Sequence, residues 1–266
     1  MNYYVHDLSP MAVEWGWFIL PWYWLSYIFG FFIVYIGMMN LSAKGQIKLS
    51  KKMTHDYLSM GFFSLILGGR LGYILIYNLG YYIKDPMKVF ALWEGGMSFH
   101  GALIGIGIYT LYKSKKSNTS FLTFTDAISI FSPVGIFFGR VSNFINGELA
   151  GRVTDVPWAV IFPKFYNGEP RHPSQLYEAL GYLAVSLLGF YLYERFHKTW
   201  PEGRFVGIIL LLGMSWRFFT EFFKDNQVAF EEGMLLNMGQ LLSVPMAILG
   251  LILIFRKQIF GAKKAS

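Results

Sequence analysis

Cysteine is absent from the 266-residue sequence. This absence excludes a disulfide scaffold, a thiolate metal site and a cysteine nucleophile within the chain. Charged residues are also scarce at 15%, whereas soluble domains contain about 25%. With 54% hydrophobic residues, the sequence is neither that of a disordered chain nor that of an ordinary water-soluble enzyme. The composition is typical of a polytopic membrane protein.

Long stretches with almost no charge indicate how the chain crosses the membrane. A helix needs about 20 apolar residues to span about 30 Å of hydrocarbon. The runs are too long, and alternate too little, for the strands of an outer-membrane barrel. They predict an all-α bundle of seven transmembrane helices. The predicted spans are 17–39, 57–82, 97–112, 127–145, 175–193, 205–223 and 234–255.

The basic residues predict the orientation of these helices. Of the 23 Lys and Arg, 14 lie in the loops after the first, third and fifth spans and in the C-terminal tail, and six lie in the other loops. Basic loops stay in the cytoplasm, so the N-terminus is expected outside and the C-terminus inside. No Lys or Arg precedes Lys44, so the basic region of a cleavable signal peptide is missing. We expect one integral membrane domain, 1–266, with an outer-side loop at about 146–174.

Polar residues inside the spans gather toward the outer leaflet. A charge in hydrocarbon costs at least about 2.5 kcal/mol on insertion scales, so a residue kept there is usually paired and functional. Only Arg70 lies near mid-span. A transport path would have polar groups through the full thickness or at the midplane, so the pattern favours a site at headgroup depth. The clustered residues are Tyr23, His100, Arg140, Asn143, Asn146, Arg171, His172, Gln175, Glu178, Arg217 and Glu221.

Spacing and residue type narrow the chemistry of this site. Arg217 and Glu221 are four residues apart and share a helical face; a salt bridge that serves only packing is an equally simple interpretation. A guanidinium group matches phosphate bidentately, so Arg140 and Arg217 suit a phospholipid headgroup. The glycines around Arg70 and after His100 have the small-residue spacing that allows close helix packing.

Five segments together resemble one known family. Residues 139–152, GRVSNFINGELAGR, resemble the signature of bacterial prolipoprotein diacylglyceryl transferases, roughly G-R-x-[GA]-N-F-x-N-x-E-x-x-G. Two positions depart from the family: Ser142 replaces a glycine or alanine, and Gly213 stands where a tyrosine is frequent. The family has seven spans with the N-terminus outside. The other matching segments are FHGALIG at 99–105, RHPSQLYE at 171–178, RFFTEF at 217–222 and MGQLLSVP at 238–245.

The resemblance implies a transferase of the bacterial cytoplasmic (inner) membrane. Such an enzyme moves the diacylglyceryl group of phosphatidylglycerol to the lipobox cysteine of a prolipoprotein, beside its signal peptide, and releases glycerol 1-phosphate. It would act first in lipoprotein maturation, with phosphatidylglycerol, the prolipoprotein and membrane lipid as partners and no cofactor, metal or nucleic acid. The expected catalytic residues are His100 as general base and Arg140 and Arg217 at the phosphate. The expected substrate contacts are Tyr23, Asn143, Asn146, Glu148, Gly151 and Glu221.

Several alternatives remain open at this point. His100 could be a structural histidine, and an arginine could stabilise the thiolate without any histidine base. Glu148 and Glu221 could orient the arginines rather than contact substrate. The chain could also be a transporter, or a lipid-binding protein without catalysis, since Gly213 removes a side chain that the family often has.

Overall fold

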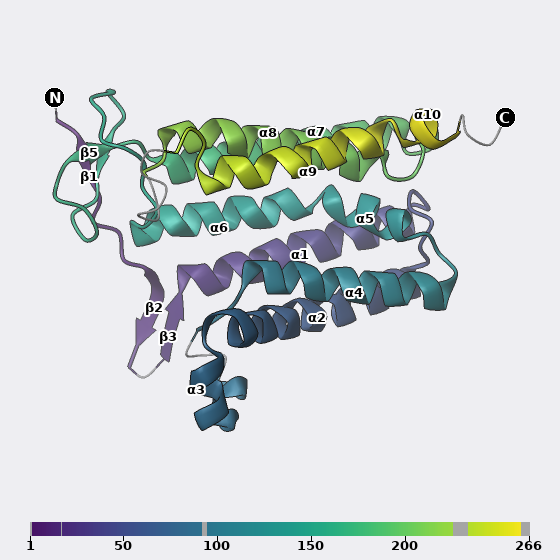
Figure 1. Cartoon of the computed structure of the whole chain (residues 1–266), viewed down its shortest axis with the longest axis horizontal. Coiled ribbons are helices and arrows are strands. Elements are labelled where there is room, and N and C mark those ends of the chain that lie inside the picture. The colour runs from purple at the N-terminus through teal and green to yellow at the C-terminus, as the bar shows by residue number, and fades with distance from the viewer. Residues whose placement is uncertain (1, 17, 92–94, 226–233, 262–266) are drawn as a thin grey trace. The chain divides into compact units, whose positions relative to one another are not determined.

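A computed structural model of the chain describes residues 2–16, 18–91, 95–225 and 234–261 (Figure 1). Most of these residues are helical. The chain divides into two compact units: unit 1 comprises residues 1–37 and 126–266, and unit 2 comprises residues 38–125. Helices α1 and α5 each cross the boundary between the units.

Unit 1 is a helical bundle in which α6 packs on α7, α7 on α8 and α8 on α9 (Figure 1). Glycines let the helices approach closely. A Cβ atom on Gly30 of α1 would lie 2.9 Å from the Cα of Gly135 of α6. Asp126 accepts hydrogen bonds from the main-chain N–H groups of Gly203 and Val206, which would otherwise be unpaired at the start of α8. The helices are α1 (Trp22–Ala43), α6 (Ser132–Asn146), α7 (Ser174–Phe196), α8 (Arg204–Thr220), η3 (Glu221–Phe223), α9 (Met238–Ile254) and α10 (Arg256–Gly261).

Among the described residues, unit 1 contains five short strands, none of which was predicted from the sequence. β2 (Met11–Trp15) and β3 (Phe18–Pro21) form an antiparallel hairpin. α1 therefore begins at Trp22, five residues after the predicted start, because residues 18–21 pair with β2. β1 (Tyr4–Val5), β4 (Val160–Ile161) and β5 (Pro170–Arg171) form a sheet in the order β1-β4-β5, with the first pair parallel and the second antiparallel.

Unit 2 is built on the close packing of α2 against α4. A Cβ atom on Gly68 would lie 2.8 Å from the Cα of Gly105, and one on Gly72 would lie 2.6 Å from the Cα of Gly101. This confirms the packing role of Gly68, Gly72, Gly101 and Gly105, whereas a Cβ atom on Gly107 would meet nothing within 4 Å. α2 ends at Tyr77 because Asn78 leaves the helical region, so the predicted span 57–82 divides into two helices. The elements are α2 (Lys51–Tyr77), α3 (Leu79–Lys84), η1 (Pro86–Phe90), α4 (Phe99–Ser117) and the start of α5 (Phe121–Ser129).

Length and hydropathy identify the helices that can cross a membrane. Four qualify by themselves: α1, α2, α7, and α8 taken together with η3. A fifth is added if α5 and α6, which meet at a bend of 43°, form one span. α9 is shorter, with 17 residues, and α4 carries lysines in its last turn. The described residues therefore form a multi-pass membrane protein, while seven spans, the side of each terminus and a single domain stay predictions.

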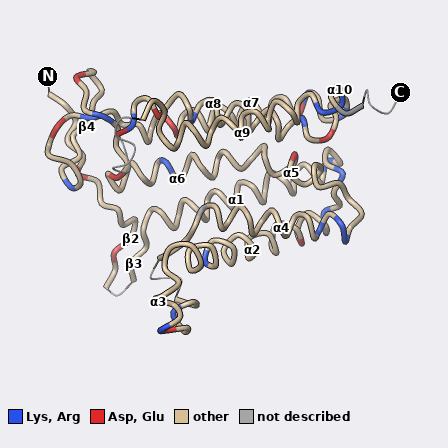
Figure 2. The backbone as a smooth tube through the Cα atoms, viewed as in Figure 1, with Lys and Arg blue, Asp and Glu red and all other residues tan. Residues whose placement is uncertain are grey.

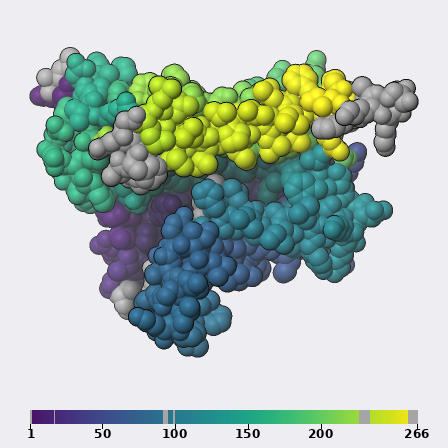
Figure 3. Space-filling model, in the orientation of Figure 1, coloured from purple at the N-terminus to yellow at the C-terminus, as the bar shows by residue number. Residues whose placement is uncertain are grey.

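The surface of unit 1 suits this environment. Lys, Arg, Asp and Glu gather toward the two ends of α7, α8 and α9, with long uncharged stretches between them (Figure 2). α9, yellow in Figure 3, runs along one face of the unit. Its apolar side chains are half-exposed there, including Leu242 and Ile248. Lipid tails can cover such residues, because they are as apolar as leucine.

Candidate active site

The candidate site lies in unit 1, at the end of the bundle where α6 ends, α7 begins and η3 follows α8. Gly147 ends α6 with a left-handed conformation, φ 78°, which glycine adopts without strain. Acidic and basic residues meet here (Figure 2). The local structure thus brings three helix ends together, each with charged side chains near it.

Glu178 of α7 is the centre of the charge network. Its side chain is 1% exposed, and its two oxygens bind cations from two separate segments of the chain. Oε2 lies 3.2 Å from Nε of Arg140 on α6, and Oε1 lies 3.1 Å from Nζ of Lys224, just after η3. A buried carboxylate needs such partners because water no longer solvates it. Glu178 therefore ties α6 to the end of α8.

The signature residues of α6 extend this network. Nη1 of Arg140 donates to Oδ1 of Asn143 over 3.3 Å. Glu148 Oε1 accepts from Nδ2 of Asn143 at 2.8 Å and from Nδ2 of Asn146 at 3.1 Å. Gln175 holds the main-chain carbonyl of Glu148 at 2.7 Å. Glu148 thus reaches Arg140 through Asn143.

Glu221 organises the opposite side of the site. Its Oε1 lies 3.8 Å from Nη2 of Arg217 and 3.0 Å from Nζ of Lys224. Its Oε2 accepts from Nδ2 of Asn237, at the start of α9, over 3.1 Å. A Cβ atom on Gly239 would overlap the Glu221 carboxylate. The glycine of the MGQ segment therefore makes room for this acid.

The basic residues differ in how far they remain accessible. The side chains of Arg140 and Arg217 are 18% and 30% exposed, whereas that of Lys224 is 3% exposed. A guanidinium has five N–H donors. The ion pairs and the bond to Asn143 occupy Nε and Nη1 of Arg140 and Nη2 of Arg217. Both arginines therefore have donors left to bind a phosphate.

The loop between α6 and α7 holds Lys224 in place through its backbone. Arg152, in this loop, donates two hydrogen bonds to main-chain carbonyls. Its backbone N–H donates to the carbonyl of Phe223, and its Nε donates to the carbonyl of Lys224 over 2.7 Å. A Cβ atom on Gly151 would lie 2.8 Å from Cβ of His172 and would overlap the carbonyl of Phe223. Glycine is thus required at position 151 for packing, and its role at the substrate stays a prediction.

Arg171 and His172 stabilise the same loop. Arg171 Nη1 is 2.7 Å from Oδ2 of Asp225, and its guanidinium lies 4.4 Å from the ring centre of Tyr166. Burial lowers the pKa of His172, so the ring is neutral at pH 7, and its Nδ1 is 3.0 Å from the hydroxyl of Tyr177. These contacts give the RHP segment a role in the structure of the loop.

Tyr23 lies at the start of α1, and the preceding residue, Trp22, contacts α6. Its half-buried ring meets that of Tyr27 edge to face, with the centres 5.2 Å apart. Ser142 Oγ donates to the carbonyl of Trp22 over 3.2 Å. Ser142, which departs from the signature, therefore gains a hydrogen bond that glycine or alanine cannot make.

His100 belongs to unit 2, whereas the arginines of the site belong to unit 1. It lies exposed in the first turn of α4. The Ser98 side chain caps this helix by accepting from the N–H of Gly101 at 3.2 Å, and the Ser98 N–H donates to the carbonyl of Gly69. The start of α4 is thus well anchored on α2, and the catalytic role of His100 stays a prediction.

Arg70 is the other basic residue of unit 2 that was predicted to lie inside a span. It is 3% exposed, and its guanidinium donates to five main-chain carbonyls in the connection between α3 and α4. Its charge is thus satisfied by protein dipoles. The acceptors are the carbonyl oxygens of Lys88, Val89, Ala91, Gly95 and Gly96.

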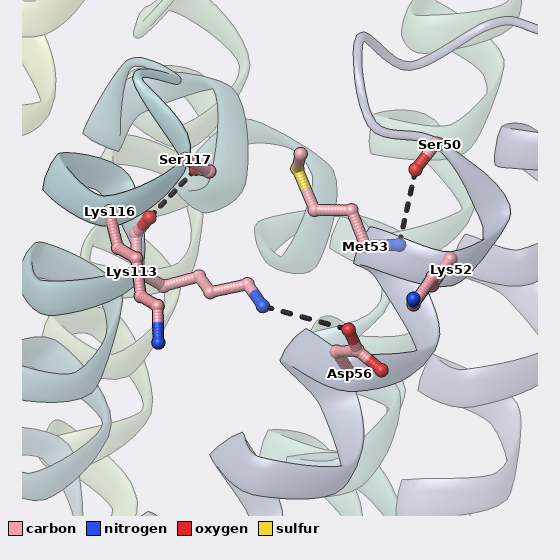
Figure 4. A pocket seen from close by; sticks show the side chains of 7 residues that line it. All are labelled: Ser50, Lys52, Met53, Asp56, Lys113, Lys116 and Ser117. Carbon is pink, nitrogen blue, oxygen red and sulfur yellow. Dashed lines mark hydrogen bonds and ion pairs between the residues drawn. The ribbon is translucent and has the colours of Figure 1, made fainter.

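A shallow pocket lies in unit 2. It is formed by the start of α2 and the end of α4 (Figure 4). Lys113 Nζ lies 4.0 Å from Oδ2 of Asp56 across it. None of the predicted site residues lines this pocket, so we do not assign the reaction to it. Its lining residues are Ser50, Lys52, Met53, Asp56, Lys113, Lys116 and Ser117.

The structure adds residues that the sequence analysis leaves out of the predicted site. Lys224 is treated there as a loop charge, although it follows Glu221 by three residues and Arg217 by seven, which is helical spacing. Glu178 is noted among the polar residues and not selected as a site residue. Asn237 has no comparable signal, because only the packing of α9 on α8 brings it to Glu221.

Comparison with known proteins identifies related sequences. A sequence model described as prolipoprotein diacylglyceryl transferase matches residues 10–256. The chain is 40% identical to the phosphatidylglycerol–prolipoprotein diacylglyceryl transferase of Aeromonas hydrophila, covering 96% of this chain and 94% of that protein. It is 41% identical to the protein of the same name from Geobacter sulfurreducens, covering 95% of this chain and 97% of that protein. The chain is 42% identical to the protein of the same name from Polynucleobacter asymbioticus, covering 94% of this chain and 96% of that protein.

Proposed function

The chain belongs to the prolipoprotein diacylglyceryl transferase family, and from this premise we propose that it transfers a diacylglyceryl group from phosphatidylglycerol to a prolipoprotein. One observation in the structure carries the proposal. Arg140 and Arg217 are each held by a buried carboxylate and remain partly exposed. Guanidinium groups presented in this way suit the phosphate of a lipid headgroup.

The reaction is an alkyl transfer to sulfur. The lipobox cysteine of the prolipoprotein, beside its signal peptide, attacks as the thiolate the glycerol carbon that bears the phosphate ester. The C–S bond forms while the C–O bond to phosphate breaks, and glycerol 1-phosphate leaves with the bonding electrons. The thiol proton goes to a base. A free cysteine has a pKa of about 8.5, so a base or a neighbouring cation must favour the thiolate at neutral pH.

Arg140 and Arg217 stabilise the leaving group. The phosphate gains negative charge as its ester bond breaks, and the arginines bind this charge better in the transition state than in the substrate. Glu178 and Glu221 hold the two guanidinium groups in place. The loss of one such donor in other enzymes slows the reaction by about 10²–10³-fold.

His100 is the proposed base. Histidine is the side chain that most often serves as a general base, and its imidazole can accept a proton from a thiol. The competing mechanism has no histidine base, and an arginine stabilises the thiolate directly. His100→Ala distinguishes the two mechanisms. The first predicts a large loss of rate that a higher pH partly restores, and the second predicts almost no change.

The remaining assignments complete the proposal. Substrate binding involves the headgroup and the peptide that carries the cysteine. The chain spans the bacterial inner membrane seven times, with its N-terminus outside and the candidate site at the outer leaflet. The residues assigned to substrate binding are Tyr23, Asn143, Asn146, Glu148, Gly151 and Glu221.

A transfer assay in reconstituted vesicles tests the function. Purified protein, phosphatidylglycerol and a lipobox peptide are mixed, and the peptide is weighed by mass spectrometry. We expect a diacylglyceryl mass gain that disappears when the peptide cysteine is changed to serine and falls about 10²–10³-fold in Arg140→Ala. Arg195→Ala, at an exposed arginine in the last turn of α7, is the matched control and should transfer normally.

Two outcomes contradict the proposal. No mass gain with folded wild-type protein would overturn the transferase function and favour lipid binding or transport. A gain that does not need the thiol would overturn the proposed chemistry at sulfur.

A further inference from the structure

Tyr182 is a buried polar residue beside the site that the proposed mechanism does not use. It lies on α7, four residues after Glu178 and therefore on the same helical face. It is 3% exposed. A tyrosine hydroxyl buried in a bundle without a partner is costly, so such a group is usually hydrogen-bonded. Its partner therefore indicates what the residue does.

The ring of Tyr182 fills the space beside a glycine of the neighbouring helix. Gly213 lies on α8, four residues before Arg217, and it is buried. A Cβ atom on Gly213 would lie 3.8 Å from Cε1 of Tyr182, which is van der Waals contact. The tyrosine thus crosses from α7 to the face of α8 that carries Arg217.

The hydroxyl of Tyr182 reaches the charged layer of the site. It lies close to the side chain of Arg217 and within electrostatic range of Arg140 and Glu178. A phenol oxygen can accept from a guanidinium N–H while its own O–H remains a donor. Tyr182 can therefore bind Arg217 and still face an anion held between the arginines.

The ion pair of Arg217 needs this support. Nη2 of Arg217 is 3.8 Å from Glu221, which is long for a charge-assisted hydrogen bond. The same oxygen of Glu221 lies 3.0 Å from Nζ of Lys224. The Arg217 side chain is 30% exposed, and exposed i,i+4 pairs restrict a side chain only weakly. Glu221 alone therefore leaves the guanidinium loosely oriented.

We infer that Tyr182 is a positioning residue that orients the guanidinium of Arg217 toward the leaving phosphate. The inference rests on the proposed transferase function. The ring, packed beside Gly213, fixes the hydroxyl, and the hydroxyl fixes the guanidinium. Arg217 then meets the phosphate already oriented, so less of its side-chain freedom is lost in the transition state.

Tyr182→Phe tests this inference by removing only the hydroxyl. We expect kcat to fall about tenfold, the size of one lost hydrogen bond to a charged group, with KM for phosphatidylglycerol little changed. The melting temperature in detergent should remain close to that of the wild type. Tyr193→Phe, at another buried tyrosine of α7 that packs against Phe205, is the matched control and should transfer normally.

A double-mutant cycle separates positioning from a general structural effect. Tyr182→Phe is combined with Arg217→Lys, which keeps the positive charge and loses the planar guanidinium. If Tyr182 acts through Arg217, the loss of the hydroxyl should slow the Arg217→Lys enzyme by much less than it slows the wild type. An equal slowing in both backgrounds, or no slowing in either, would overturn the inference.

A second readout does not require catalysis. Rotation of the Arg217 guanidinium, measured by NMR on protein labelled with ¹⁵N-arginine, should be faster in Tyr182→Phe and unchanged in Tyr193→Phe. Unchanged rotation in Tyr182→Phe would overturn the inference, even in a protein that transfers lipid. Faster rotation in a protein without transfer would support the positioning contact and count against the proposed function alone.

Discussion

Both units contain arginine in predicted membrane spans, but the exposure and the hydrogen-bond acceptors of these arginines differ. In unit 2, Arg70 is 3% exposed, and its guanidinium donates to five main-chain carbonyls. In unit 1, Arg140 and Arg217 are 18% and 30% exposed and are held by carboxylates. A guanidinium has five donors, so the carbonyls around Arg70 match its full capacity. The arginines of unit 1 keep donors for a ligand.

This comparison shows that an arginine inside a span is not by itself evidence of a binding site. Because burying a charge is costly, every charged residue inside a span suggests a functional site. The groups that accept hydrogen bonds from the arginine distinguish the two cases. An arginine surrounded by carbonyls of a connecting loop has a structural role. An arginine that is paired with a carboxylate and remains partly exposed can also bind a ligand. Unit 2 thus uses its arginine to hold the chain before α4, and unit 1 uses its arginines to present charge.

The largest expected effect is on the stability of unit 2. Arg70→Ala leaves five carbonyls without their donor. Hydrogen bonds to charged groups contribute about 1.5–3 kcal/mol each, so the loss of five should cost at least about 5 kcal/mol, and the melting temperature in detergent should fall sharply. Arg70→Lys, with three donors, should lie between wild type and alanine.

Lys84→Ala, at an exposed cation of α3, serves as the control for Arg70→Ala. A variant that melts like the wild type but no longer binds phosphatidylglycerol would place Arg70 among the binding arginines. That result would break the comparison between the units.

The second effect concerns the acid that holds two cations of unit 1. Glu178→Gln removes the charge that faces Arg140 and Lys224. Breaking a buried ion pair costs about 3–5 kcal/mol. Transfer should fall about 10²-fold because Arg140 loses its orientation. The rate is measured by mass spectrometry of the peptide, and stability by thermal unfolding.

Glu169→Gln is the matched change for Glu178, because Glu169 is a half-exposed acid that pairs with Arg171. It should alter neither rate nor stability by more than about 1 kcal/mol. Normal transfer by Glu178→Gln would show that the carboxylate does not position Arg140.

The third prediction tests whether Glu221 positions Arg217. Gly239→Ala places a methyl group against the Glu221 carboxylate, and overpacking of this kind costs about 1–3 kcal/mol. The displaced carboxylate should loosen Arg217, so transfer is expected to fall about tenfold. Gly107→Ala adds the same methyl group in α4 where nothing lies within 4 Å. Equal rates for the two variants would contradict a positioning role for Glu221.

The smallest effect is expected at Ser142. Ser142→Ala restores a residue that the family signature allows and removes the hydrogen bond to the carbonyl of Trp22. The expected loss of stability is about 1 kcal/mol, seen as a small shift of melting temperature, with transfer unchanged. A tenfold loss of transfer would instead place Ser142 at the substrate.

Much of the site was accessible to sequence reasoning. The paired spacing of Arg217 and Glu221 predicted a contact within one helix, and it is present at 3.8 Å. The signature identified Arg140, Asn143 and Glu148, which form one hydrogen-bonded network. These predictions succeeded because the residues are close in sequence, so helix geometry alone sets their separation.

Other features could not be predicted in this way. Glu178 and Arg140 are 38 residues apart in the sequence, and their contact depends on how α6 packs on α7. Lys224 was assigned to a loop because it follows the predicted span 205–223, whereas the structure buries it between two acids. Residues 18–21, which form β3, were included in the first span because hydropathy does not distinguish a short apolar strand from a helix.

By itself, the sequence determined that this protein is a multi-pass membrane protein with a family signature, because hydropathy and local spacing are properties of short segments. Only the tertiary structure decided which arginine is structural and which arginines present charge. Acceptors for Arg70 come from the chain between α3 and α4, and those for Arg140 and Arg217 come from α7 and η3. The physical reason is that the free energy of a buried charge depends on the groups packed around it, and packing brings most of those groups from elsewhere in the chain.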